Sequence, residues 1–125
     1  MPISERVTRI IGWILSGLLC ALLAFSASLK LSGAQEAVDG FKKFGLEDWR
    51  IIIGIGEVCS AILFLIPRTA VAGTLLLSAY VGGAIVTHMQ HGEPIVLPSI
   101  VLVVVWIAAG LRMPELSRTL IQGKA

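Results

Sequence analysis

Three ionisable residues, Lys30, Glu57 and His88, lie within or at the ends of otherwise apolar stretches of the chain. Ionisable groups cost a few kcal/mol at the centre of a bilayer, so those in spanning segments are rare and usually face the interior of a helix bundle. Glu57 follows Ile51 by six residues, which is about 9 Å along a helix. Lys30 and His88 each end an apolar stretch, so helices that run up and down place all three groups at one level.

A polar stripe on one predicted helix indicates which side chains share a site with Glu57. Tyr80, Ala84 and His88 are spaced four residues apart and therefore lie on one helix face. If Glu57 faces this stripe, then Lys30, Glu57, Tyr80 and His88 line a polar ligand-binding pocket. The long Lys30 side chain can reach inward to Glu57 or outward to water. The alternative to a pocket is a Lys30–Glu57 ion pair that only fixes the helix register.

A metal site and an independent catalytic centre have little support. His88 and His91 have an H-x-x-H spacing and Glu57 would be a third ligand, but Gly92 and Pro94 indicate that the helix is ending there. We therefore expect no metal. The chain has no dinucleotide fingerprint, P-loop or catalytic triad spacing, and its two cysteines, at positions 20 and 59, lack a redox spacing and are expected to be packing residues. The residues therefore predict no independent catalytic centre.

The composition predicts that these residues are positioned by membrane helices. Of the 125 residues, 56% are hydrophobic and only 14% charged, whereas about a quarter are charged in soluble domains. The net charge of +2 is too small to indicate nucleic-acid binding. The apolar runs are continuous rather than alternating, which excludes the strands of a membrane barrel.

Four apolar stretches are each close to the roughly 20 residues that cross about 30 Å of hydrocarbon. We expect a single all-α domain over residues 1–125, folded as an antiparallel bundle of four transmembrane helices. The first stretch has an apolar core of about 20 residues, longer than that of a usual signal peptide, so we favour a retained helix. The expected spans are Ile10–Leu29, Ile51–Ile66, Val71–Thr87 and Ile95–Leu111.

A short interfacial helix is expected over residues 33–44, between the first two spans. Ser32 and Gln35 have the spacing of a capping box, and Asp48 is placed to cap the second span. We favour a connector at the membrane surface, and the alternative is a lid over an opening between helices. The apolar residues that recur on one face of this helix are Ala37, Val38, Phe41 and Phe44.

The distribution of basic residues predicts the orientation of the chain in the membrane. Six lie on the side of the two termini and four on the other side, which places both termini in the cytoplasm and the protein in the inner (plasma) membrane. The six are Arg6, Arg9, Arg68, Arg112, Arg118 and Lys124, and the four are Lys30, Lys42, Lys43 and Arg50.

Small residues on the second and third spans predict close helix packing. The same surface could accept a flat lipid or quinone ring. The residues concerned are Gly54, Gly56 and Ser60 on the second span, and Ser78, Ala79, Gly82 and Gly83 on the third.

Four ordered sequence elements resemble those of the DoxX-like family of small four-helix membrane proteins. The resemblance extends from Arg9 to Arg112. It implies a compact four-helix bundle in which Lys30, Glu57 and His88 are the positions of interest. The small-residue step that usually precedes the first-helix lysine reads Ser26-Ala27-Ser28 here, which is a modest departure. The four elements are Lys30-Leu31-Ser32-Gly33, Gly54-x-Gly56-Glu57, Ile66-Pro67-Arg68 and Gly83-Ala84-Ile85-Val86-Thr87-His88.

The resemblance allows two functional hypotheses of different classes. The family name comes from a subunit of a thiosulfate:quinone oxidoreductase, and other relatives are associated with redox-stress complexes or with the assembly of membrane partners. One hypothesis is a ligand-binding or accessory subunit of a membrane redox complex, with a quinone or lipid-like ligand at the outer side. The other is a structural or assembly protein without a small-molecule ligand. Expected partners are membrane lipid, a further copy of the chain or a membrane redox protein.

A third hypothesis, a transporter, ranks last. Four short helices would have to oligomerise to form a transport pathway.

Overall fold

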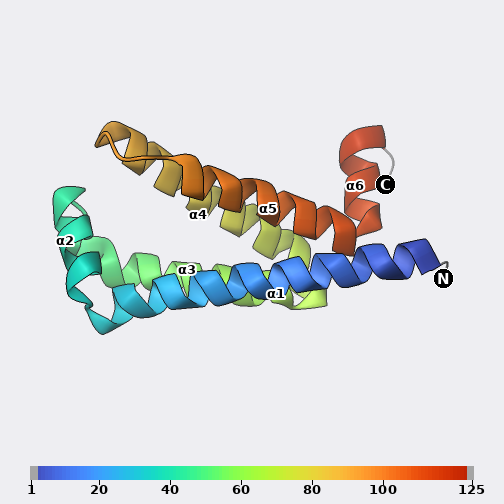
Figure 1. Ribbon diagram of the computed structural model, residues 1–125, viewed down its shortest axis with the longest axis horizontal. Helices are drawn as coiled ribbons and strands as arrows, with labels where there is room; N and C mark the ends of the chain where they lie inside the picture. The colour runs from blue at the N-terminus through green and yellow to red at the C-terminus, as the bar shows by residue number, and fades with distance from the viewer. Residues whose placement is uncertain (1–2, 124–125) are drawn as a thin grey trace.

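The computed structural model describes residues 3–123, and these residues form helices and turns without any strand (Figure 1). The all-α prediction is confirmed. Lys124, which was counted in the orientation argument, lies outside the described residues. The long helices are α1 (Ile3–Ser32), α3 (Arg50–Leu65), α4 (Ala70–Gln90) and α5 (Val96–Arg112); the short elements are α2 (Gln35–Lys43), η1 (Glu47–Trp49), η2 (Pro67–Thr69) and α6 (Pro114–Gln122).

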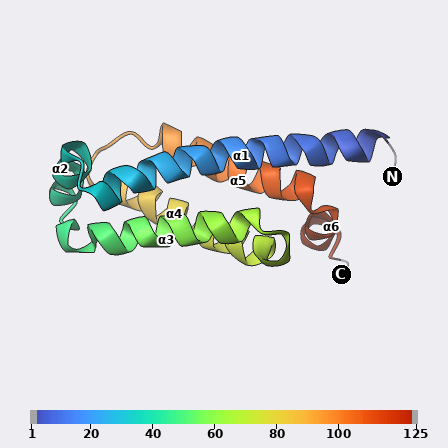
Figure 2. The same cartoon turned by 90° about the horizontal axis from the view of Figure 1, so that it is seen from below.

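The four long helices alternate in direction and form a ring of neighbours. Helix α1 packs against α3 and α5, and α4 packs against the same two helices. Figure 1 shows the start of α1 and the whole of α6 at one end of the molecule, and α2 with the α4–α5 connection at the other. Seen from below in Figure 2, α6 is viewed nearly end-on, beside the end of α5.

Two of the four expected membrane spans meet the requirements of length and apolar composition on their own. These are α1 and the segment Pro67–Gln90, whereas α5 and α6 qualify only as a pair bent by 109°. Helix α3 has 16 residues and is therefore about 24 Å long, less than the roughly 30 Å of hydrocarbon in a bilayer. The structure supports a membrane protein with two or three spans among the described residues, and four spans stay a prediction.

The helix boundaries differ from the apolar stretches that predicted them. Helix α1 begins at Ile3 rather than Ile10, and α4 ends at Gln90 rather than Thr87. Hydropathy marks only the apolar part of a helix, while backbone hydrogen bonding continues through polar residues. Helix α2 lies within the expected range 33–44, and its predicted apolar face is half-buried while its charged residues are exposed.

The two expected helix caps are wrong. Ser32 belongs to the last turn of α1, where its hydroxyl donates to the Leu29 carbonyl, and Ala34 is the N-cap of α2. Asp48 lies within η1, and Trp49 precedes α3. In both places the chain forms an additional turn next to the predicted cap, so the capping residue is displaced from the helix start.

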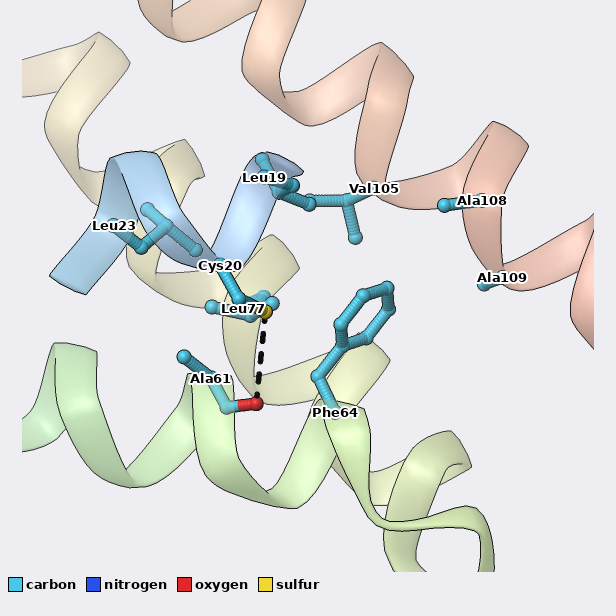
Figure 3. Packing of buried hydrophobic residues seen from close by; sticks show 9 residues of the cluster. All are labelled: Leu19, Cys20, Leu23, Ala61, Phe64, Leu77, Val105, Ala108 and Ala109. Carbon is cyan, nitrogen blue, oxygen red and sulfur yellow. Dashed lines mark hydrogen bonds between the residues drawn. The ribbon is translucent and has the colours of Figure 1, made fainter. Parts of the chain in front are cut away.

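The apolar core lies where all four long helices meet (Figure 3). The ring of Phe64 is fully buried at its centre, and the thiol of Cys20 donates a weak hydrogen bond to the Ala61 carbonyl, 3.8 Å away. Cys59 is exposed on the outside of α3, so only Cys20 acts as the expected packing residue. The nine core residues are Leu19, Cys20, Leu23, Ala61, Phe64, Leu77, Val105, Ala108 and Ala109.

Glycines bring the helices together at the end that carries α6. A Cβ atom on Gly12 of α1 would lie 2.8 Å from the Arg112 side chain of α5, and one on Gly73 of α4 would collide with the Phe64 backbone of α3. Gly54 is also in close contact, here with Leu31. In contrast, Cβ atoms on Gly56, Gly82 and Gly83 would meet no described atom within 4 Å. The predicted close packing is therefore right for Gly54 and wrong for these three glycines.

Replacing Gly73 by alanine tests this close approach. Because the added methyl group would overlap the α3 backbone, Gly73→Ala should lower the free energy of unfolding by about 1–3 kcal/mol. Gly82→Ala, on the same helix but in open space, should be neutral or stabilise the protein by about 0.5–1 kcal/mol through helix propensity. Thermal unfolding of both variants in detergent measures the difference, and equal melting temperatures would contradict the glycine crossing.

Candidate ligand-binding site

A cavity of about 500 Å³ lies between the helices at the end of the bundle next to α2. Lys30, Glu57, Tyr80 and His88 all line this cavity, so the structure brings together the four residues that the sequence singled out. They come from α1, α3 and α4. In Figure 1 the helices lie close together at the α6 end and diverge toward this end. The cavity thus occupies the wider half of the bundle, beyond the apolar core.

The Lys30 and Glu57 side chains form an ion pair in the wall of the cavity. The Lys30 ammonium lies 3.0 Å from Glu57 Oε1 and also donates to the Ser26 hydroxyl at 2.5 Å. Glu57 is only 2% exposed and the Lys30 side chain 15%, so the lysine reaches inward rather than outward to water. An isolated carboxylate at this position would be strongly destabilising, which makes the lysine its necessary partner.

Gly54 sets the distance between α1 and α3 at this ion pair. A Cβ atom on Gly54 would lie 3.0 Å from the Leu31 side chain and 3.2 Å from Lys30 Cβ. Gly54 precedes Glu57 by three residues, so both lie on the face of α3 that meets α1. Arg50, one turn earlier, donates a hydrogen bond to the Lys30 carbonyl oxygen. These contacts hold the end of α1 against the start of α3.

Tyr80, on α4, approaches the same carboxylate. Its phenol interacts electrostatically with Glu57. Glu57 is therefore contacted by Lys30 from α1 and by Tyr80 from α4. Gly83 and Ala84, within about one turn of Tyr80, also line the cavity. Because glycine has no side chain and alanine has only a methyl group, these two positions leave space that a larger residue would fill.

The two histidines make similar local contacts, but only His88 lines the cavity. Nδ1 of His88 lies 2.6 Å from the Ala84 carbonyl, and Nδ1 of His91 lies 2.8 Å from the Thr87 carbonyl. Because a carbonyl oxygen only accepts, each Nδ1 carries a proton and Nε2 is the acceptor in the neutral ring. Nε2 of His88 is thus the nitrogen that can bind a ligand hydroxyl.

The end of α2 covers the histidines and forms part of the cavity wall. The ring of Phe44 lies 5.2 Å from the His88 ring and 5.0 Å from the His91 ring, between centroids. Phe41 and Phe44 both line the cavity. The segment therefore forms part of the cavity wall, and its role as a connector or as a lid stays a prediction.

An ion pair between Lys43 and Glu93 ties α2 to the α4–α5 connection. The hydrogen bond and positive charge of Lys43 lower the pKa of Glu93. The carboxylate therefore stays ionised below the usual pKa of a glutamate. This contribution to stability is present at neutral pH and is lost as the pH falls through the lowered pKa. Near neutral pH this exposed ion pair links α2 to the α4–α5 connection.

Arg112 has a structural role that the sequence does not indicate. The distribution of basic residues assigns it to the terminal side as an orienting charge, but it is only 6% exposed and lies between helices. Its guanidinium donates to the Ser16 hydroxyl at 3.1 Å and to the Phe64 carbonyl at 2.9 Å, and it stacks on the Trp13 ring at 4.0 Å. Arg112 therefore connects α5 to α1 and α3. Its position at the end of an apolar stretch is also typical of a surface arginine, so hydropathy carries no signal for this role.

The cavity has a mostly apolar wall with a few hydrogen-bonding groups that a ligand can use, rather than a cluster of metal-binding side chains. Within residues 3–123, no group of three or more His, Cys, Asp or Glu side chains is arranged to hold a metal ion. The apolar part of the wall includes Leu23 from α1, Ile53 from α3 and Val101 from α5. An uncharged molecule with a polar end fits this distribution of groups.

The long apolar helices place this chain in the class of helical membrane proteins. More closely, the chain belongs to the DoxX-like family, whose model matches residues 14–109. The matched residues include the Lys30–Glu57 ion pair, Tyr80 and His88. Comparison with the curated proteins and with the solved structures gave no match.

A pair of variants tests the dependence of Glu57 on its partner. Lys30→Met leaves the Glu57 carboxylate buried without a cation and should lower the free energy of unfolding by about 3–5 kcal/mol. Lys30→Met combined with Glu57→Leu removes both charges and should be closer to the wild-type protein in stability. Unfolding in detergent measures both effects. A double variant as unstable as the single one would show that the ion pair is not the origin of the loss.

Proposed function

We propose that this protein binds an apolar small molecule with a polar head, of the quinone class, in the cavity beside the Lys30–Glu57 ion pair. In this proposal it is a ligand-binding or accessory subunit of a membrane redox complex. The observation that carries the proposal is a cavity of about 500 Å³ with apolar walls and the polar groups of Lys30, Tyr80 and His88. This volume lies within the range of about 300–1,000 Å³ that is usual for small-molecule sites.

The polar groups suit the head of a quinone or hydroquinone. Quinone oxygens accept hydrogen bonds, which the Lys30 ammonium can donate, because Glu57 and Ser26 use only two of its three N–H groups. A hydroquinone hydroxyl can donate to Nε2 of His88. Glu57 holds Lys30 and Tyr80 in place. The chain would supply binding and orientation, and electron transfer would belong to the partner in the complex.

The exposed parts of the cavity wall suit a ligand that arrives from the bilayer. Leu22 on α1 is 45% exposed and Leu97 on α5 is 64% exposed, and both line the cavity. Apolar side chains that face both the cavity and the outside of the bundle provide a route that a lipophilic tail can follow. The head would then bind at Lys30 and His88 while the tail extends into lipid.

The placement in the membrane follows the distribution of charge and apolar surface. We propose that α1, α3, α4 and α5 all cross the inner (plasma) membrane with both termini in the cytoplasm, as the basic residues indicate. The cavity then lies in the outer half of the membrane. Helix α2, with a half-buried apolar face and an exposed charged face, lies at the outer interface.

Replacing His88, with His91 as the matched control, tests the polar end of the site. Both rings contact the Phe44 ring in a tilted arrangement and both Nδ1 atoms bond to a carbonyl one turn earlier, but only His88 lines the cavity. His88→Ala should weaken binding of a short-chain hydroquinone about tenfold, the effect of losing one hydrogen bond worth roughly 1.4 kcal/mol. His91→Ala should bind nearly as the wild type does.

Equilibrium binding to the full-length protein in lipid nanodiscs provides the measurement, with helical content as a check on folding. If neither variant changed the affinity, the assignment of His88 to the head of the ligand would be wrong. The same conclusion would follow if both variants changed the affinity to the same degree.

Filling the cavity at Gly83 tests the apolar part of the site. Gly83 lines the cavity and Gly82 does not, although both have open space where a Cβ would stand. Gly83→Leu should abolish quinone binding without preventing folding, and Gly82→Leu should leave it unchanged.

The same pair of variants separates this function from the structural alternative. A protein that acts only in assembly would keep its fold and lose self-association or partner binding when the Gly82–Gly83 surface is altered. Size-exclusion chromatography with light scattering, run beside the binding assay, distinguishes the two. Loss of association in both variants, with no quinone binding by the wild type, would favour the assembly role.

A further inference from the structure

A second cleft, of about 400 Å³, lies at the opposite end of the bundle, between the first two turns of α1 and helix α6. Helix α6 is bent by 109° from α5. Residues of α6 and of the start of α1 line this space, and Figure 1 shows both elements at the same end of the molecule. Pro114, at the start of α6, also lines the cleft. All of its lining residues lie outside residues 14–109, the part of the chain that the family model matches.

Two arginines from different helices line this cleft. Arg9 lies on α1 and Arg118 on α6, and both line the cleft and are exposed. Neither guanidinium forms a hydrogen bond or an ion pair with any other residue within 3–123. Glu5 also lines the cleft and is likewise unpaired within these residues, so the three charges sum to one positive charge.

Uncharged polar groups add to the binding capacity of the cleft. The Ser4 hydroxyl and the Gln122 side-chain amide line it and are not used by other residues of the described chain. Both groups donate hydrogen bonds to an anion. A guanidinium binds phosphate oxygens through two parallel hydrogen bonds, and a phosphodiester carries the one negative charge that balances the cleft.

The surroundings of the arginines favour a lipid over a free anion. Leu120 and Ile121 on α6 are 60% and 83% exposed, and Ile3 and Val7 on α1 are 79% and 48% exposed. Ile121 itself lines the cleft. Large apolar side chains beside basic residues on a short helix are typical of segments that lie in the interface of a membrane. A water-soluble phosphate would gain nothing from these side chains, whereas acyl chains would pack against them.

We propose that this cleft binds an anionic phospholipid, with its phosphodiester between Arg9 and Arg118 and its acyl chains against Ile121 and the neighbouring apolar residues. The lipid joins α6 to the start of α1 at the end of the bundle that carries both termini. This site is separate from the cavity beside Glu57 and does not depend on the function proposed for that cavity.

Native mass spectrometry of the detergent-purified full-length protein, titrated with phosphatidylglycerol, tests the site. The wild type should retain one phosphatidylglycerol in preference to phosphatidylcholine. Arg9→Gln with Arg118→Gln should weaken this binding about tenfold, because charge-assisted hydrogen bonds to the phosphate are lost. Arg6→Gln with Arg68→Gln removes the same charge from exposed arginines that do not line the cleft and is the matched control. It should bind as the wild type does.

Two outcomes would overturn the proposal. Equal losses in the two double variants would mean that phosphatidylglycerol responds to the overall charge and not to the cleft. Displacement of the lipid by millimolar inorganic phosphate would identify a site for a free anion instead. All four arginines are exposed, and circular dichroism of each variant verifies that the helices are retained.

Discussion

A buried carboxylate in an apolar helix bundle needs a cation and hydrogen-bond donors within reach, and this requirement at Glu57 organises the end of the molecule next to α2. Lys30 supplies the cation from α1, and Tyr80 supplies a hydroxyl from α4. Gly54 allows the helix contact at which the ion pair forms. The ion pair is therefore both a structural link among helices and part of a cavity wall, so the two interpretations of these residues are compatible.

The cavity exists because the two ends of the bundle pack differently. At the α6 end, Gly12 and Gly73 permit near contact of helix backbones, and Arg112 bonds to groups on two neighbouring helices. At the other end, small residues such as Gly83 leave space unfilled. The helices diverge from the tightly packed end, and α2 covers the wider end through Phe44. A bundle with uniform packing would leave no room for a ligand.

Much of the fold and of the candidate site could be predicted from residue type and spacing. Continuous apolar runs predict helices because every backbone polar group must be satisfied internally in lipid. The four-residue spacing of Tyr80 and His88 places them on one face, and ionisable residues in apolar stretches face inward because exposure to lipid is costly. The predicted helix ends agree less well with the structure. Ser32 and Asp48 have the chemistry of capping residues, but the local path of the chain places them in other turns.

The sequence by itself determined the helical class of this protein and the level at which Lys30, Glu57 and His88 meet, because helix periodicity and the cost of burying charge act locally along the chain. Only the tertiary structure decided which glycines touch a neighbour, that Arg112 is buried, and that Phe44 covers the histidines. These features depend on distances between helices far apart in the sequence. Gly73 and Gly82 are the same residue type on the same helix, and only the position of α3 makes one a contact and the other open space.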